Sequence, residues 1–134
     1  MNATELMLGD WVYDKVLKAK GKVEAIMERK IRCDINVNLC DEDEFRPIAI
    51  TTARLKKIGW KYYSRLKSGV LDSDVFDTLY EDKFEVIYYP ETKQLNILYD
   101  DGEQYYDMLV ITVNYIHEIQ HAFRISGIKT EIQL

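Results

Sequence analysis

The clearest pattern in the chain is a strict alternation of apolar and polar side chains over residues 31–39. Period two over that length predicts a half-buried β-strand. Gly9 and Asp10 form a turn signal before the first strand, and the acidic run 41–44 indicates a solvated turn. Several short antiparallel strands in residues 1–50 favour a small SH3-like barrel or curled sheet. The predicted strands are 11–13, 22–27, 31–39 and 45–50.

The remainder of the chain begins with helical signals and then returns to strand patterns. Thr51 or Thr52 is placed to cap a short helix that ends at Gly59. Two apolar and aromatic runs, 84–90 and 94–100, flank a three-residue turn. Their spacing predicts a β-hairpin.

The C-terminal part carries the strongest helical periodicity. It predicts a helix from about residue 113 to 126, stopped by Gly127. The tail 128–134 alternates and predicts a final edge strand. Residues 60–69 are expected to form another helical turn or a loop, and the acidic stretch 70–82 has no clear pattern.

These patterns together predict an α+β fold. A β-rich SH3-like lobe would be followed by a helix, a β-hairpin, the C-terminal helix and a short terminal strand. The length of 134 residues suits one domain, so a lobe of residues 1–50 and an α+β portion of residues 51–134 are expected to pack as one unit. A hydrophobic fraction of 47% excludes a disordered chain.

Charge and targeting signals limit the partners and the cellular location that we expect for the protein. The net charge of −5 argues against a protein that binds nucleic acid over its whole surface, although a local basic face remains open. No apolar run reaches the roughly 20 residues that span a membrane, and the first residues lack a secretory signal. Cys33 and Cys40 form no C-x-x-C pair. We therefore expect a cytoplasmic protein with no membrane partner and two idle thiols.

One motif points to chemistry. His117, Glu118 and His121 spell H-E-x-x-H inside the predicted C-terminal helix. Histidines at i and i+4 lie one turn apart on one face, where both can reach a zinc ion, and the glutamate between them can polarise a zinc-bound water. The motif predicts a minimal zinc hydrolase with His117 and His121 as ligands and Glu118 as the base.

The surroundings of the motif favour a different interpretation. A catalytic zinc needs a third protein ligand, yet Arg124 and Gly127 stand where one extended form of the motif needs Gly and His, and Glu131 is the one acid downstream. On a helical wheel the histidines lie opposite the apolar stripe, where solvent-facing side chains go. We favour an exposed polar helix face, with no cofactor and no catalytic residue.

A second cluster combines cations with aromatics. Residues 54–67 contain six basic residues and no acid, interleaved with Trp60, Tyr62 and Tyr63. Such a face can bind phosphates and stack bases, although a solvated helix with aromatics in the core explains it as well. The candidate nucleic-acid-binding residues are Arg54, Lys56, Lys57, Lys61, Arg65 and Lys67.

Three segments resemble a family of small uncharacterised proteins from Bacteroides and relatives, often found in phage-like or mobile-element regions. They are NATELMLGDWVY, RPIAITTARLKKIGW and VNYIHEIQHAFRISGIKTEIQL; typical members have NATELRIGNYV, PIPLTEEILLKNGF and YVHELQHALRLCGIEKEIEL. In that family the terminal motif also occurs with Gln for the Glu or Asn for the second His. The resemblance implies a mobile-element source and a structural helix, and it supplies no activity.

Three functions follow as hypotheses. The preferred one is a non-enzymatic interaction protein that binds a protein partner or itself, with exposed tyrosines of the 84–100 hairpin as contacts. The alternatives are a zinc hydrolase that uses the HEIQH motif and a nucleic-acid-binding accessory protein that uses the 54–67 face.

Overall fold

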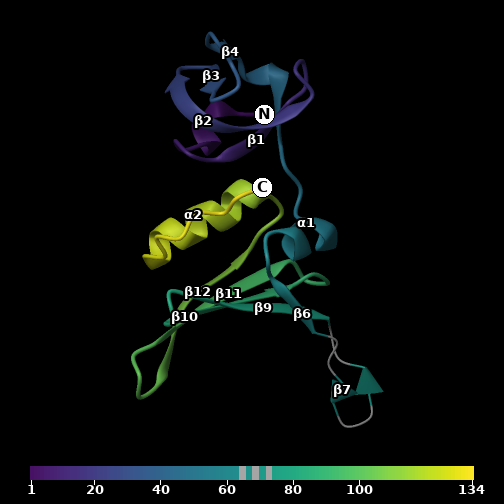
Figure 1. Ribbon diagram of the computed structural model, residues 1–134, viewed down its shortest axis with the longest axis vertical. Helices are drawn as coiled ribbons and strands as arrows, with labels where there is room; N and C mark the ends of the chain where they lie inside the picture. Colours follow the sequence, from purple (N-terminus) through teal and green to yellow (C-terminus); the bar gives the residue numbers. More distant parts are fainter. Residues whose placement is uncertain (64–65, 68–69, 72–73) are drawn as a thin grey trace.

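The computed structural model describes residues 1–63, 66–67, 70–71 and 74–134. Two antiparallel β-sheets lie on either side of the C-terminal helix α2 (Figure 1). The fold is therefore α+β, as predicted. The elements are η1 (Ala3–Glu5), β1 (Trp11–Asp14), β2 (Ala19–Met27), β3 (Lys30–Cys33), β4 (Cys40–Asp41), η2 (Glu42–Glu44), β5 (Phe45–Pro47), α1 (Thr52–Lys57), β6 (Lys61–Tyr63), β7 (Leu66–Lys67), β8 (Val70–Leu71), β9 (Val75–Tyr80), β10 (Phe84–Tyr89), β11 (Gln94–Asp100), β12 (Tyr105–Thr112) and α2 (Ile116–Ser126).

The N-terminal sheet is an open sheet and not a closed barrel. Its strands follow the order β4-β3-β2-β1-β5, so β4 and β5 form its two edges within the described residues. Alternate side chains of the strands point inward and form a small core of their own, which includes Val12, Val23, Ile31 and Phe45. The predicted short strands are confirmed, whereas the predicted barrel does not close.

The strand predicted over residues 31–39 is too long. β3 ends at Cys33 because polar side chains bind the backbone there. Asp34 Oδ1 accepts a hydrogen bond from the Lys22 N–H at 3.0 Å, and Asn36 Oδ1 accepts one from the Cys33 N–H at 2.9 Å. Asp and Asn side chains that capture backbone donors favour turns over ladders, and Val37 is consequently left 90% exposed.

The acidic run 41–44 is not simply a solvated turn. It contains the short helix η2, and Glu42 is buried. One oxygen of its carboxylate accepts the Ala3 N–H at 2.8 Å, and the other lies 2.9 Å from Arg29 Nε. The backbone donor and the guanidinium lower the pKa of Glu42 below its usual value, which explains how this acid enters the fold.

The C-terminal sheet has the order β12-β11-β10-β9-β6 and forms the main core together with α2, α1 and the C-terminal tail. The predicted hairpin is confirmed: β10 and β11 pair antiparallel, with Val86 opposite Ile97. Two strands correct the prediction for residues 60–69 and 70–82. β6 replaces the expected helical turn or loop, and β9 runs through the acidic stretch with Phe76 fully buried.

The helix α1 forms as its end signals predict. The Thr51 hydroxyl accepts a hydrogen bond from the Arg54 N–H at 3.2 Å, which satisfies a free donor of the first turn. Gly59 follows the last turn with a φ of +96°, a conformation that glycine adopts without strain. Leu55 is the residue by which α1 enters the main core.

The helix α2 packs its apolar stripe on the C-terminal sheet, with Ile116, Ile119 and Phe123 buried. It begins at Ile116, three residues later than predicted, because the Val113 N–H donates to the Lys93 carbonyl and Tyr115 forms a β-bridge with Ala49. The tail after Gly127 forms no strand. Its extended backbone instead places Ile128 and Ile132 in the core, each 4% exposed. No helix in the described ranges is long and apolar enough to cross a membrane.

Candidate functional site

Glu118, the expected catalytic base, caps its own helix. Its Oε1 accepts hydrogen bonds from the Asn114 N–H at 2.8 Å and from the Tyr115 N–H at 2.9 Å. A carboxylate near a helix N-terminus satisfies free backbone donors and interacts favourably with the helix dipole. The group that would polarise a zinc-bound water is therefore engaged in holding the first turn of α2.

His121 belongs to a partly exposed cluster around one buried carboxylate, here called the Asp10 cluster, which consists of Asp10, His121 and Arg124. Asp10 has no solvent exposure. His121 Nε2 lies 2.6 Å from Asp10 Oδ2, and Arg124 Nη1 donates to Oδ1 at 2.7 Å. The Met7 N–H also donates to Oδ2 at 2.8 Å. A buried carboxylate is tolerated when its oxygens are compensated in this way, and the cluster ties α2 to the segment before β1.

His117 is buried as well, with an exposure of 4%. Its ring stacks on Tyr115 with centroids 5.8 Å apart and meets the edge of the His121 ring at 5.5 Å. Its Nδ1 has no hydrogen-bond partner among the described residues. The expectation that both histidines face solvent is wrong, because the N-terminal segment covers the face of α2 opposite the apolar stripe.

The arrangement does not fit a zinc centre. A zinc ion needs free nitrogen, sulfur or carboxylate donors in tetrahedral geometry, but His121 Nε2 is paired with Asp10. Across the described ranges no group of three His, Cys, Asp or Glu side chains could hold a metal ion. Cys33 lies in the N-terminal core, where burial raises the pKa of its thiol to about 12. We therefore derive no catalytic step from the motif.

Replacing His117 by Phe is expected to leave the free energy of unfolding at neutral pH within about 1 kcal/mol of the wild type, because it removes a buried nitrogen without a partner. Burial lowers the pKa of His117, while Asp10 opposes that shift. The unfolded chain thus binds the proton more readily, and stability falls as pH drops below about 6.5.

Urea unfolding of both proteins at about pH 7.5 and about pH 5.5 measures this effect. The wild type should lose more stability between the two pH values than the His117→Phe variant. An identical loss in both proteins would show that His117 does not resist protonation in the folded state.

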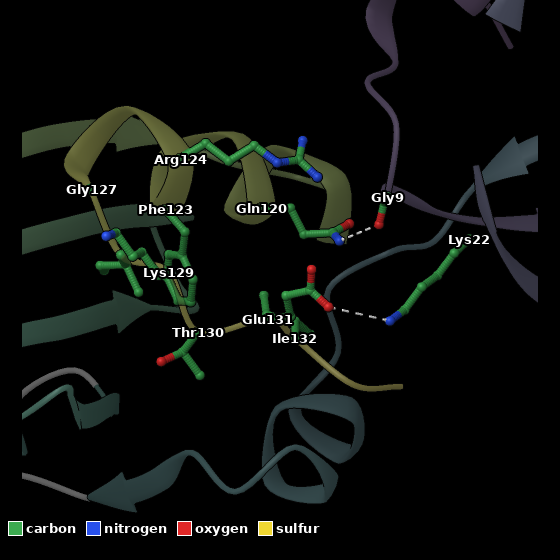
Figure 2. A pocket seen from close by; sticks show the side chains of 11 residues that line it. Gly9, Lys22, Gln120, Phe123, Arg124, Gly127, Lys129, Thr130, Glu131 and Ile132 are labelled. Carbon is green, nitrogen blue, oxygen red and sulfur yellow. Dashed lines mark hydrogen bonds and ion pairs between the residues drawn. The ribbon is translucent and has the colours of Figure 1, made fainter. Parts of the chain in front are cut away.

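Gln120, at an unconstrained position of the H-E-x-x-H motif, makes two of the contacts between α2 and the N-terminal segment. Its Nε2 donates to the Gly9 carbonyl at 3.0 Å (Figure 2), and its Oε1 accepts the Trp11 N–H at 2.9 Å. The Trp11 indole in turn donates to the Ile132 carbonyl at 2.8 Å. Sequence reasoning missed both Gln120 and Asp10, since each partner lies more than 100 residues away and no local pattern marks it.

A cavity of about 410 Å³ lies beside these contacts, between α2, the tail and the N-terminal sheet (Figure 2). Gln120 and Arg124 reach it from α2, whereas His117, Glu118 and His121 do not line it. Lys22 and Glu131, which both line the cavity, form a salt bridge at 3.6 Å (Figure 2). The space next to the helix is therefore separate from the three residues of the motif. Its walls are Gly9, Lys22, Gln120, Phe123, Arg124, Gly127, Ile128, Lys129, Thr130, Glu131 and Ile132.

The basic set of residues 54–67 is divided in the structure. Arg54, Lys56 and Lys57 lie on α1, and Lys61 is exposed on β6. Arg65 lies outside the described residues, as does the side chain of Lys67.

The aromatic residues of the same segment divide in a similar way. Trp60 enters the main core and stacks on Phe123, whereas Tyr62 and Tyr63 are 40% and 47% exposed. Lys56 Nζ lies 4.9 Å from the centre of the Tyr62 ring. The described part of this face thus offers cations and the exposed rings of Tyr62 and Tyr63, whereas the Trp60 indole is buried.

No protein-family model, curated protein or solved structure matches this chain.

Proposed function

We propose that the protein is a non-enzymatic interaction protein in which the HEIQH segment joins the two sheets. The observation that carries this proposal is the use of the motif's reactive groups: Glu118 caps α2, and His121 pairs with Asp10. A group committed to such contacts is not free to bind a metal or to transfer a proton. The resemblance to proteins of mobile elements agrees with an accessory role and remains part of the proposal.

The contact surface that we propose is the free edge of β12. Within the described residues β12 pairs with β11 alone, so one side of its eight-residue backbone carries unpaired N–H and C=O groups. Soluble proteins normally protect such an edge with charges, prolines or bulges. β12 has one charged residue, Asp107, and one irregularity at Met108, where its register with β11 shifts. It nevertheless exposes Tyr105, Tyr106, Met108 and Val110.

The tyrosines expected to make contacts on the 84–100 hairpin are poorly placed for that role. Tyr88 is buried, and Tyr99 packs against the main core. The exposed aromatic and apolar side chains lie one strand further along, on β12. We therefore propose a contact surface on the same sheet as the expected hairpin but on β12.

The simplest partner for the β12 edge is the same edge of a second copy. Two antiparallel copies around a two-fold axis would satisfy each other's backbone groups and form one continuous sheet. We also propose that the N-terminal sheet is an open relative of an SH3-like barrel, because β1 pairs with both β2 and β5.

Sedimentation velocity over a wide range of protein concentration tests the self-association. The wild type should form dimers, and the double variant Met108→Lys/Val110→Lys should be monomeric, because charges on an edge oppose strand pairing. Leu79→Lys is the matched control, since Leu79 is 58% exposed on β9, away from the edge. A wild type that stays monomeric throughout, or a double variant that still dimerises, would overturn this proposal.

A further inference from the structure

A second cavity, also of about 410 Å³, lies where the N-terminal sheet approaches α1. Lys18, Lys20, Arg46 and Arg54 line it, and no acidic residue does. The chain as a whole carries a net charge of −5, so this concentration of positive charge is local. The remaining walls are Tyr13, Ala19, Pro47, Ile48 and Ala49.

The cations of this cavity lie close together without a counter-charge. Burial, followed by the charges of Lys57 and Arg54, lowers the pKa of the Lys20 ammonium. None of the four lining cations, nor Lys57, forms a salt bridge within the described part of the chain. Like charges this close disfavour each other unless an anion lies between them.

The two guanidinium groups are held in place before any ligand arrives. Arg46 lies 4.3 Å above the centre of the Tyr13 ring, an attractive cation–π contact. Arg54 Nη1 donates to the Ala49 carbonyl at 2.9 Å, which leaves its other N–H groups available. Planar guanidinium forks beside ammonium groups are the donor set that proteins use for phosphate.

We propose that this cavity, here called the phosphate pocket, binds a phosphate group through Lys20, Arg46 and Arg54, with Lys18 and Lys57 beside them. The volume exceeds that of one phosphate and lies in the range of ligand sites, so the group belongs to a larger molecule or to a nucleic-acid strand. Lys56 and Lys61 extend the positive charge along α1 and β6, which suits a strand. The pocket works in this way whether or not β12 pairs with a second copy.

Two probes test the pocket on the full chain at low salt: a fluorescent single-stranded oligonucleotide, followed by anisotropy, and pyrophosphate, followed by calorimetry. The variants are Arg46→Gln and Lys20→Gln/Lys57→Gln. The control is Lys30→Gln, an exposed cation on β3. Circular dichroism verifies that each variant is folded.

The double variant should bind the oligonucleotide about tenfold more weakly, because one charge-assisted contact and one neighbouring positive charge are lost. Its slope of log affinity against log salt should fall by up to about 1.4, since two cations near the strand are removed. Lys30→Gln should bind like the wild type. If the oligonucleotide does not bind but pyrophosphate does, with the same dependence on the pocket residues, the phosphate pocket stands and its ligand is a small phosphorylated molecule. Failure of both probes to bind the wild type, or equal binding by variants and control, would overturn the proposal.

Discussion

Replacing Asp10 by Ala is expected to lower the free energy of unfolding by about 3 kcal/mol, because it removes the buried carboxylate that His121, Arg124 and the Met7 N–H share. Asp10 is fully buried. Its carboxylate pairs with His121 and Arg124 and accepts a hydrogen bond from the Met7 N–H. Without it, two cationic or polar side chains and one backbone donor lose their acceptor. Guanidinium chloride unfolding followed by circular dichroism measures the change.

Asp43→Asn provides the control for this experiment. Asp43 is exposed in η2, and surface substitutions of this kind change stability by about 0.5 kcal/mol or less. If Asp10→Ala proved as mild as the control, the Asp10 cluster would not hold α2 to the N-terminal segment.

Replacing Gln120 by Ala is expected to cost about 2 kcal/mol, because it leaves a backbone N–H and a backbone C=O without partners in a half-buried site. The affected groups are the Trp11 N–H and the Gly9 carbonyl. Glu118→Gln should cost less, since the amide oxygen still accepts the hydrogen bonds that cap α2. In a zinc peptidase motif the Glu is required for catalysis and the position of Gln120 is unconstrained, whereas here we expect the fold to depend more on Gln120 than on the charge of Glu118.

Ile125→Ala is the matched control on the same helix, because Ile125 is 74% exposed. It should leave the unfolding midpoint nearly unchanged. A Gln120→Ala variant that unfolds at the same denaturant concentration as Ile125→Ala would mean that water replaces the lost contacts without cost.

The three segments that carry the family resemblance meet in space. Residues 2–13 supply Asp10, residues 46–60 supply Ile48, and residues 113–134 supply α2. Besides the Asp10 cluster, the Ile116 N–H donates to the Ile48 carbonyl at 2.9 Å. We infer that these three segments together form the junction between the two sheets, which agrees with a structural role for the HEIQH sequence.

The sequence correctly predicted the elements that are stabilised by contacts between neighbouring residues. The Thr51 cap, the stop at Gly59 and the β10–β11 hairpin each depend on residues close in sequence. The strand predicted over residues 31–39 was too long because the alternation of apolar and polar residues does not reveal what Asp34 and Asn36 bind. Their side chains accept hydrogen bonds from backbone N–H groups and so compete with strand pairing.

The environment of the motif could not be predicted in the same way. A helical wheel identifies one apolar face and assigns the opposite face to solvent. In this fold α2 lies between two sheets, so the opposite face meets the segment that contains Gly9, Asp10 and Trp11. Contacts across more than 100 residues leave no periodicity in a single sequence. The same reason hides the phosphate pocket, whose cations come from β2, β5 and α1 and from the turn before β2.

The central claim, that HEIQH is a structural junction and not a metal centre, is tested most directly by zinc content. The protein would be purified without a metal-affinity tag from zinc-supplemented medium and analysed by plasma mass spectrometry, together with the His117→Phe variant. The expected result is a zinc content far below one ion per chain and equal in both proteins. One tightly held zinc ion per wild-type chain that is lost in His117→Phe would contradict the claim.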